Sequence, residues 1–324
     1  MIASPLRLPS DPSVTFDTYK EYNAARKQLR LGQPGEAPYV SDALSNRFRE
    51  TEFMLNMKAD YAIGKGKWRV MGGYEIQHLS YKTFQGTETD AVHHVSGDEM
   101  KAPNGFALLQ RDYQQGLVYG LDGGWVSLLQ TALIYDTRDF EPDPTRGLYF
   151  KAANEFSNPV IGSQFSFDKV FLQGRVYQKI PVGKQTVFAA RIGAGNIFGD
   201  KAPFVEFQDQ WSPDGSINAL GGRQSLRGYR ANRFLARSLA FANAELRIRI
   251  ADLKFGRQNF GFGVAPFFDA GTVGDRWQDL NFTRIRTPYG GGARIAWNLS
   301  TILFADYGIS REDRLFYFGI GQNF

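Results

Sequence analysis

The chain has 324 residues, of which 43% are hydrophobic and 15% aromatic, with 35 glycines and no cysteine. This composition suits one large β domain, and the lack of cysteine excludes disulfides, thiolate catalysis and cysteine-ligated zinc. The net charge of +5 is modest for this length, so it does not indicate a nucleic-acid partner. No apolar run approaches the ~18 to 20 residues that a membrane-spanning helix needs.

Residues 1–48 form a predicted N-terminal segment with a less regular pattern than the rest of the chain. They have room for at most one strand, near residues 14–30. The opening "MIASPLRLPSDP" has neither the basic start nor the apolar run of a signal peptide. We therefore expect either a mature or truncated form, or a start that lies further upstream.

From residue 49 onwards the hydrophobic period is two, which predicts strands. In "ANAELRIRI" (242–250), alanine, leucine and isoleucine alternate with asparagine, glutamate and arginine. Segments 148–156 and 170–180 alternate in the same way. Eight further segments show the pattern less cleanly: 52–63, 67–82, 126–139, 186–197, 258–270, 288–298, 301–310 and 314–324. The sequence thus predicts about eleven strands.

The length of these strands indicates a membrane barrel. At about 9 to 14 residues they exceed the usual strand of a soluble sheet and match a tilted transmembrane strand. One face is apolar, as lipid requires, and the other carries charges, as a wet lumen allows. Short and long connections alternate, which predicts periplasmic turns, extracellular loops and a C-terminus at the periplasmic end. We expect residues 49–324 to form an all-β, antiparallel transmembrane β-barrel in the bacterial outer membrane.

The last strand, "RLFYFGIGQNF", adds a separate signal. Phe316, Phe318, Ile320 and Phe324 are predicted to share the lipid face, and the chain ends on an aromatic residue. The strand resembles the C-terminal signal by which outer-membrane barrels are handed to the assembly machinery. The alternative is an ordinary amphipathic last strand.

Three internal motifs resemble those of the BamA/TamA superfamily, also called the bacterial surface antigen family. They are "SLRGYRANRF" (225–234), "YDTRDFEPDPTRGLYF" (135–150) and "FFDAGTVGD" (267–275). With the last strand, the resemblance covers roughly residues 49–324. It implies a sixteen-stranded barrel in which the loop 198–237 folds back into the lumen and its arginine pairs with acidic residues on inner strands.

The residues of this loop allow a physical interpretation of that contact. An arginine inside a lumen needs acceptors in a fork geometry, and strand parity makes Glu245 and Asp269 the candidates for Arg227. Gly228 would permit a sharp turn, and Tyr229 would pack over the glycines of the strand 258–270. The alternative places the arginines in solvent or against lipopolysaccharide phosphates. We favour this alternative for the other three arginines of the loop: Arg223, Arg230 and Arg233.

No residue pattern indicates catalysis, a cofactor or a metal site. The three histidines, His78, His93 and His94, lack further ligands in sequence. The sequence contains no nucleophile elbow, zinc-protease motif or phosphate-binding loop. We therefore expect a protein that is not an enzyme.

The chain departs from the family pattern in two respects. We expect no periplasmic repeat domains within these 324 residues, and about twelve strands fit in them, so that we expect either a twelve-stranded barrel or part of a sixteen-stranded one. Three functions stay open: outer-membrane assembly with protein insertion or translocation, passive diffusion, and anchoring of an enzyme or passenger encoded upstream. The expected partners are outer-membrane lipid, lipopolysaccharide and the outer-membrane assembly machinery, and no nucleic acid.

Overall fold

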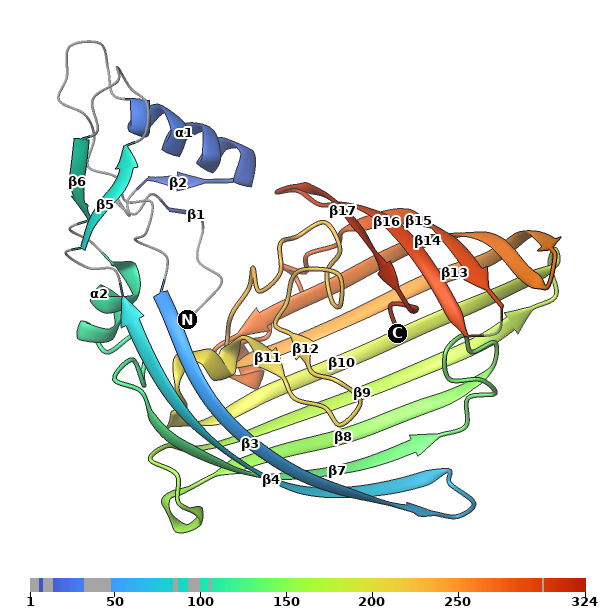
Figure 1. Ribbon diagram of the computed structural model, residues 1–324, viewed down its shortest axis with the longest axis horizontal. Coiled ribbons are helices and arrows are strands. Elements are labelled where there is room, and N and C mark those ends of the chain that lie inside the picture. Colours follow the sequence, from blue (N-terminus) through green and yellow to red (C-terminus); the bar gives the residue numbers. More distant parts are fainter. Residues whose placement is uncertain are drawn as a thin grey trace.

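A computed structural model describes residues 6–7, 14–31, 48–83, 87–92, 100–104, 107–298 and 300–324. Eleven antiparallel strands form one strongly curved sheet in the order β17-β16-β15-β14-β13-β10-β9-β8-β7-β4-β3 (Figure 1). Their bounds are β3 Phe48–Ile63, β4 Trp68–Thr83, β7 Gly124–Asp136, β8 Gly147–Ser157, β9 Ser166–Ile180, β10 Gln185–Lys201, β13 Ser238–Phe255, β14 Gln258–Gly274, β15 Tyr289–Trp297, β16 Thr301–Ile309 and β17 Arg314–Ile320.

Each of the eleven predicted strands is confirmed, and most are longer than predicted. β10 continues beyond its predicted end to Lys201, because its ladder with β9 resumes there after an irregularity between Phe198 and Lys201. β13 reaches 18 residues for the same reason, since it stays paired with β14 to Phe255. Such lengths exceed the ~9 to 11 residues that a tilted strand needs to cross a bilayer, so these strands also extend beyond the membrane.

The two faces of the sheet differ in chemistry as the alternation predicts. On the concave face, which we call the lumen, polar side chains such as Asn243 and Glu245 are buried. The convex face exposes Ile192 (66%) and Phe318 (80%). Aromatic residues lie towards both ends of this face: Trp125 and Tyr289 at one end, Trp68 and Trp297 at the other. An apolar band between two aromatic girdles is the surface of a barrel that faces lipid.

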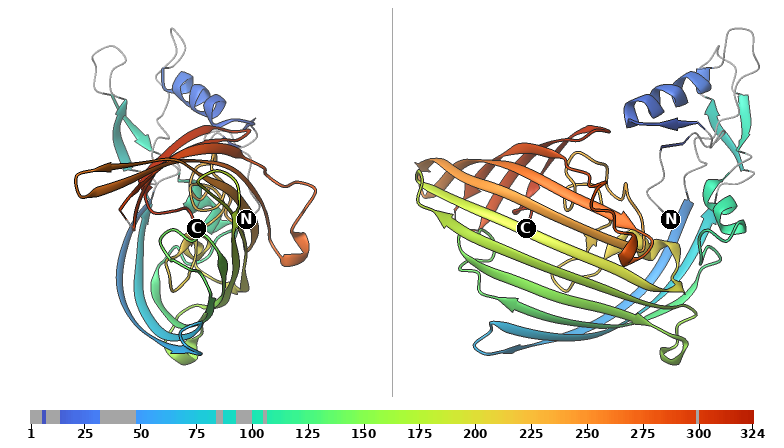
Figure 2. Two further views of the ribbon diagram at one scale, coloured as in Figure 1. Left: turned by 90° about the vertical axis from the view of Figure 1, so that its right-hand side faces the viewer. Right: turned by 180° about the vertical axis from the view of Figure 1, so that it is seen from behind.

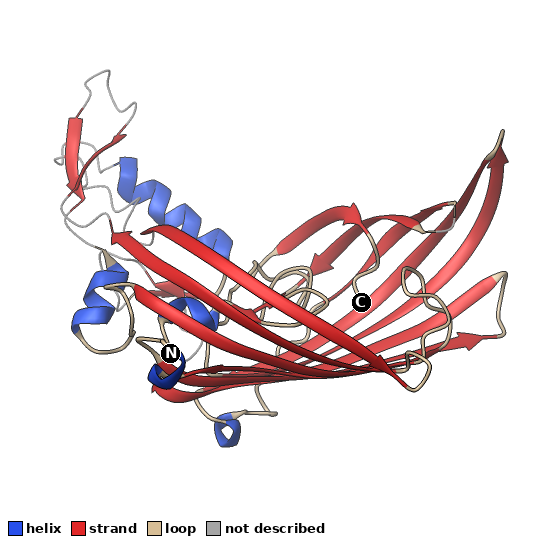
Figure 3. Cartoon of the chain, turned by 60° about the horizontal axis from the view of Figure 1, so that its bottom comes forward, coloured by secondary structure: helices blue, strands red, loops and turns tan. Residues whose placement is uncertain are grey.

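The long connections gather at one end of the sheet, together with the helices (Figure 3). Their described parts are β5 Thr87–Val92, β6 Met100–Asn104 and residues 107–123 with α2 Leu108–Gln114; residues 202–237; and residues 275–288, which contain η3 Trp277–Asp279. We call this the loop end. The opposite end carries turns as short as 181–184 and 256–257, and the chain terminates there after β17. Among the described residues, no helix is long and apolar enough to cross a membrane.

The N-terminal segment differs from its prediction. Instead of at most one strand near 14–30, it has two paired two-residue strands, β1 Leu6–Arg7 and β2 Thr15–Phe16, followed by helix α1 Tyr19–Leu31. The helix begins at a capping box. The Glu21 amide donates to the Thr18 hydroxyl oxygen and the Thr18 amide donates to the Glu21 carboxylate, both at 3.2 Å.

The sheet wraps around the lumen without closing (Figure 2). Its edges are β3 and β17, and in the described part of the chain neither edge strand pairs with a second neighbour of the sheet. Among the described residues this sheet therefore has eleven strands rather than the predicted twelve, because residues 19–31 form a helix.

Candidate functional site

Residues 202–237, which connect β10 to β13, lie in the lumen, and we call them the plug loop (Figure 1). The loop contains η2 Phe204–Phe207, β11 Asp209–Gln210 and β12 Ile217–Asn218. Its apolar residues form a core with lumen-facing side chains of the wall. The members from the loop are Ile217, Leu220, Leu226, Tyr229, Phe234 and Ala236, and those from the strands are Phe171, Leu239, Phe241 and Val273. Burial of this core holds the loop against the wall.

Arg227 lies at the centre of the contact between the plug loop and the wall. Its guanidinium is 0% exposed and makes a two-pronged contact with Asp269 on β14: Nε to Oδ2 at 2.9 Å and Nη2 to Oδ1 at 2.7 Å. Nη1 donates to Glu245 on β13 and to Asp306 on β16, the latter at 3.4 Å. The guanidinium carbon also stacks 3.5 Å from the centre of the Phe267 ring. One side chain therefore joins three strands.

The carboxylates around Arg227 have further partners on the wall. Arg247 donates to Glu245 at 3.2 Å, and Arg294 pairs with Asp306. The Asn243 amide donates to Asp269 Oδ1 at 2.7 Å. Three arginines thus face three carboxylates, a balanced set that leaves no buried charge uncompensated. We call this set the arginine lattice: Arg227, Arg247, Arg294, Glu245, Asp269 and Asp306.

Gly228 allows the backbone of the loop to touch the wall. Its φ is +101°, and a Cβ built on it would lie 2.8 Å from the carbonyl carbon of Ile309. On the wall, Gly308 has the reciprocal property, since its Cβ would lie 2.6 Å from the Gly228 nitrogen. The Gly228 amide donates to the Tyr317 hydroxyl at 3.0 Å, and that hydroxyl donates to the Tyr229 carbonyl at 3.0 Å. A glycine pair and one tyrosine therefore fix the Arg-Gly-Tyr backbone.

The structure brings together Arg227, Glu245 and Asp269, and it adds five residues that were not predicted for this site: Arg247, Arg294, Asp306, Gly308 and Tyr317. Two of them could have been predicted from strand parity, because Asp306 and Tyr317 lie on the polar faces of the last two predicted strands. The predicted position of Tyr229 is wrong. Its ring packs edge-on against Phe234 at 5.1 Å, within the core of the plug loop, rather than over the glycines of β14.

The other arginines of the loop are not simply solvated. Arg223 stacks 4.3 Å from the Phe304 ring inside the lumen and donates to the carbonyl of Gln322. Arg233 pairs with Glu312 at 2.7 Å, and both side chains are largely buried. Arg230 comes nearest to the predicted position in solvent. Its side chain is 48% exposed, and its carboxylate partner, Asp313, is 3.4 Å away.

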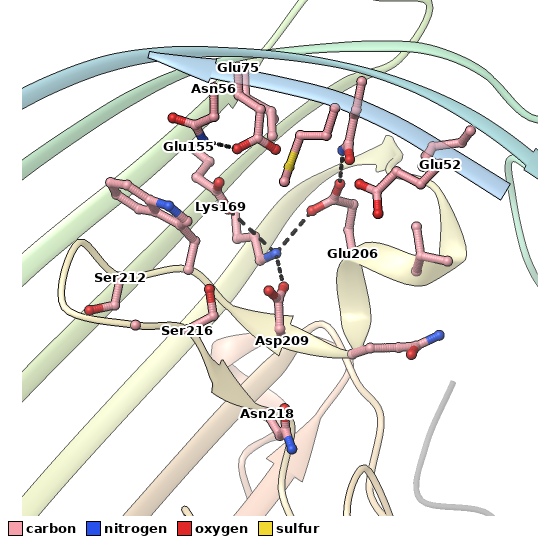
Figure 4. A pocket seen from close by; sticks show the side chains of 18 of the residues that line it. Glu52, Asn56, Glu75, Glu155, Lys169, Glu206, Asp209, Ser212, Ser216 and Asn218 are labelled. Carbon is pink, nitrogen blue, oxygen red and sulfur yellow. Dashed lines mark hydrogen bonds and ion pairs between the residues drawn. The ribbon is translucent and has the colours of Figure 1, made fainter. Parts of the chain in front are cut away.

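A second charged contact fixes the other half of the plug loop, with the signs reversed. Here the wall supplies the cation: Lys169 on β9 contacts Glu206 at 2.9 Å and Asp209 at 2.8 Å, both from the loop, and Glu155 on β8 at 3.5 Å (Figure 4). Nearby, Lys151 pairs with Asp214 of the loop at 2.6 Å. We call these six residues the lysine anchor. They line a cavity of about 800 Å³ between the loop and the inner face of β3 and β4, except Lys151 and Asp214, which lie beside it.

The sequence matches the Omp85 superfamily domain over residues 3–324. The chain belongs to the Omp85 superfamily. It is 27% identical over 160 residues to the outer membrane protein assembly factor BamA of Nitratidesulfovibrio vulgaris, covering 45% of this chain and 18% of that protein. The crystal structure of BamA from Haemophilus ducreyi lacking POTRA domains 1–3 has a similar fold, with a TM-score of 0.54 at 15% identity. That match covers 85% of this chain and 54% of the other.

The family membership and the fold confirm the predicted BamA/TamA-type barrel. The chain spans only part of the length of either relative, 18% of one and 54% of the other. The chain is an outer-membrane-type β-barrel of the Omp85 superfamily.

The C-terminus of this Omp85 chain is placed differently from its prediction. Phe316, Phe318 and Ile320 lie on the lipid face, each at least 62% exposed. Phe324, predicted on the same face, is only 6% exposed and lies in the lumen, with its ring 4.7 Å from the Arg191 guanidinium. The cause is Gly321, whose φ of +96° ends β17 and turns the last residues inwards.

The structure offers no arrangement for metal chemistry among its described residues, where no group of three or more histidine, cysteine or acidic side chains is placed to hold an ion. His78 packs against the Trp125 ring at 4.8 Å. His93 and His94 lie outside the described residues.

Proposed function

We propose that this Omp85 chain resides in the bacterial outer membrane and acts in outer-membrane assembly, as the barrel through which proteins are inserted or translocated, with the plug loop closing its lumen. The single observation that carries the proposal is the complete burial of Arg227 between three strands of the wall. Burial of a charge is costly unless several partners compensate it, and the partners of Arg227 are on the wall. We therefore infer that the loop stays inside the lumen in the functional protein.

The assembly role is supported by the similarity to BamA of Nitratidesulfovibrio vulgaris, an outer membrane protein assembly factor. Passive diffusion is the weaker alternative. A diffusion channel needs an open lumen, whereas here the plug loop contacts the wall at the arginine lattice and at the lysine anchor. We also propose that Phe316, Phe318, Ile320 and Phe324 belong to the signal read by the outer-membrane assembly machinery.

Reconstitution tests the proposal directly. The protein is placed in vesicles of outer-membrane lipid, an unfolded β-barrel client is added, and folding is followed by the client's protease protection and heat-modifiable migration on a gel. We expect faster client folding than in empty vesicles, and loss of this acceleration in Arg227→Ala but not in Arg230→Ala, which removes an exposed arginine of the same loop.

Single-channel recording provides the second measurement. We expect little conductance from the parent protein and increased, fluctuating conductance from Arg227→Ala, because the loop is then free to leave the lumen. Steady, large conductance from the parent protein, without any effect on client folding, would favour the diffusion channel.

A further inference from the structure

A second cavity, of about 690 Å³, lies at the loop end of the sheet, between the 275–288 loop and the turn after β16. Three of its ten lining residues are arginines, Arg284, Arg286 and Arg311, and none is acidic. We call them the pocket arginines. They belong neither to the arginine lattice nor to the lysine anchor.

The pocket arginines have no carboxylate partner, unlike the nearby Arg230 and Arg233 of the plug loop. Among the described residues, no aspartate or glutamate oxygen lies within the 4.0 Å of an ion pair from their guanidinium groups. The acidic residues of the adjacent turn are engaged elsewhere, Glu312 by Arg233 at 2.7 Å and Asp313 by Arg230 at 3.4 Å. Three cations therefore face one cavity with nothing on its lining to neutralise them, which favours an anionic ligand.

The wall of the cavity is partly rigid. Arg286 continues the ladder beyond the start of β15, because its backbone exchanges two hydrogen bonds with Gly271 of β14, at 2.9 and 3.0 Å. Its guanidinium lies 3.9 Å from the centre of the Phe234 ring of the plug loop. Tyr229, only 4% exposed, lines the inner side of the cavity. Arg286 is thus held in position, whereas Arg284 and Arg311 reach in from exposed loops.

The outer side of the cavity is continuous with the surface that faces lipid. Tyr289 lines the cavity and is also the first residue of the lipid face of β15, 56% exposed. Ile285, another lining residue, is 39% exposed, and the neighbouring Phe282 is 67% exposed. The pocket arginines, which could bind a charged head group, therefore lie next to apolar side chains that could contact acyl chains. Both lie at the edge of the surface that faces lipid.

We propose that this cavity binds the phosphate of a lipid in the leaflet at the loop end, with lipopolysaccharide as the lipid of that chemistry in an outer membrane. Guanidinium groups bind phosphate oxygens by paired, charge-assisted hydrogen bonds, and three of them can surround one phosphate. The proposal rests on the proposed outer-membrane location, since that location supplies the phosphorylated lipid. The site would hold the loop end of β14 to β16 at a fixed height in the membrane.

The test uses the full chain in detergent, with purified fluorescent lipopolysaccharide and its enzymatically dephosphorylated form as probes. Variants Arg284→Gln and Arg311→Gln, singly and together, are compared with Arg276→Gln, which removes an exposed cation from the same 275–288 loop but does not line the cavity. We expect the phosphorylated lipid to bind more tightly than the dephosphorylated one. Each pocket substitution should weaken its binding by about tenfold, as loss of a charged hydrogen bond predicts, and Arg276→Gln by much less.

Equal affinity for the two forms of the lipid would overturn the proposal, as would equal weakening by Arg276→Gln. Inorganic pyrophosphate that binds as tightly as the lipid would overturn the assignment to a lipid. The measurement is independent of the proposed function, because binding in detergent is read without client folding. A protein absent from the outer-membrane fraction that still binds in this way would instead contradict the proposed location.

Discussion

The plug loop is attached to the wall at two places, the arginine lattice and the lysine anchor. The two differ in whether the loop or the wall supplies the cations and the carboxylates. In the arginine lattice the loop supplies one cation and the wall supplies three carboxylates, two of which, Glu245 and Asp306, also pair with Arg247 and Arg294. In the lysine anchor the wall supplies the cations and the loop supplies the acidic residues, with Glu155 as an additional carboxylate of the wall. The loop thus carries its acidic residues in its first half and its basic residues in its second.

The two contacts also differ in their access to water. Every side chain that contacts Arg227 in the lattice is at most 1% exposed, whereas Asp209 of the lysine anchor is 42% exposed and borders the 800 Å³ cavity. Water near Asp209 can take over part of the solvation when its partner is lost, and no water can do so for Asp269. The arginine lattice should therefore be the stronger attachment of the loop to the wall. The lysine anchor should break first when the protein unfolds.

Replacing Arg227 by alanine should give the largest effect, because it leaves three buried carboxylates with two arginines. We expect a loss of about 3 to 5 kcal/mol in unfolding free energy. Heat-modifiable migration and urea unfolding in detergent measure it. A double-mutant cycle with Asp269→Ala should be strongly non-additive; strictly additive, small losses would show that the pair contributes little.

Lys169→Met tests the other attachment. We expect a loss of about 2 to 3 kcal/mol, below that of Arg227→Ala, since Asp209 stays partly solvated after the lysine is removed. Lys179→Met, an exposed lysine on the same strand, is the matched control and should be nearly neutral. A larger loss for Lys169→Met than for Arg227→Ala, measured by the same urea unfolding, would reverse the ranking of the two attachments.

Gly228→Ala tests the close approach of the loop backbone to β16 without removing any charge from the arginine lattice. The new Cβ would meet the Ile309 backbone at 2.8 Å, so the loop must move away from β16. Gly215→Ala is the control: its φ of +110° is equally strained for alanine, but nothing lies within 4 Å. We expect Gly228→Ala to cost about 1 to 3 kcal/mol more than the control in thermal unfolding. Equal losses would mean that the close approach to Gly308 is unimportant.

Arg230→Ala should have the smallest effect. Its pair with Asp313 is 3.4 Å long and its side chain is 48% exposed, so solvent screens the interaction. We expect a loss of about 0.5 kcal/mol or less in urea unfolding. A loss comparable to that of Arg227→Ala would remove the distinction between buried and exposed arginines of the loop.

The secondary structure of the barrel could be predicted from sequence because its signal is local. The alternation of apolar and polar residues sets which face of each strand meets lipid, and all eleven strands and their lumen-facing residues follow from it. The same parity selected Glu245 and Asp269 as the acidic residues nearest to Arg227. Helix α1, which was not predicted, also has a local signal in the sequence, the Thr18–Glu21 capping box.

What only the tertiary structure decided is which distant residues meet across the lumen. Asp306 lies 79 positions from Arg227, and Glu206 lies 37 from Lys169; no spacing along the chain links them, because the path of the plug loop brings them together. The position of Phe324 could not be predicted from the alternation of faces along the strand. Alternation holds only while φ stays extended, and at Gly321 the backbone turns into the lumen, where burial beside Arg191 and Arg247 replaces contact with lipid.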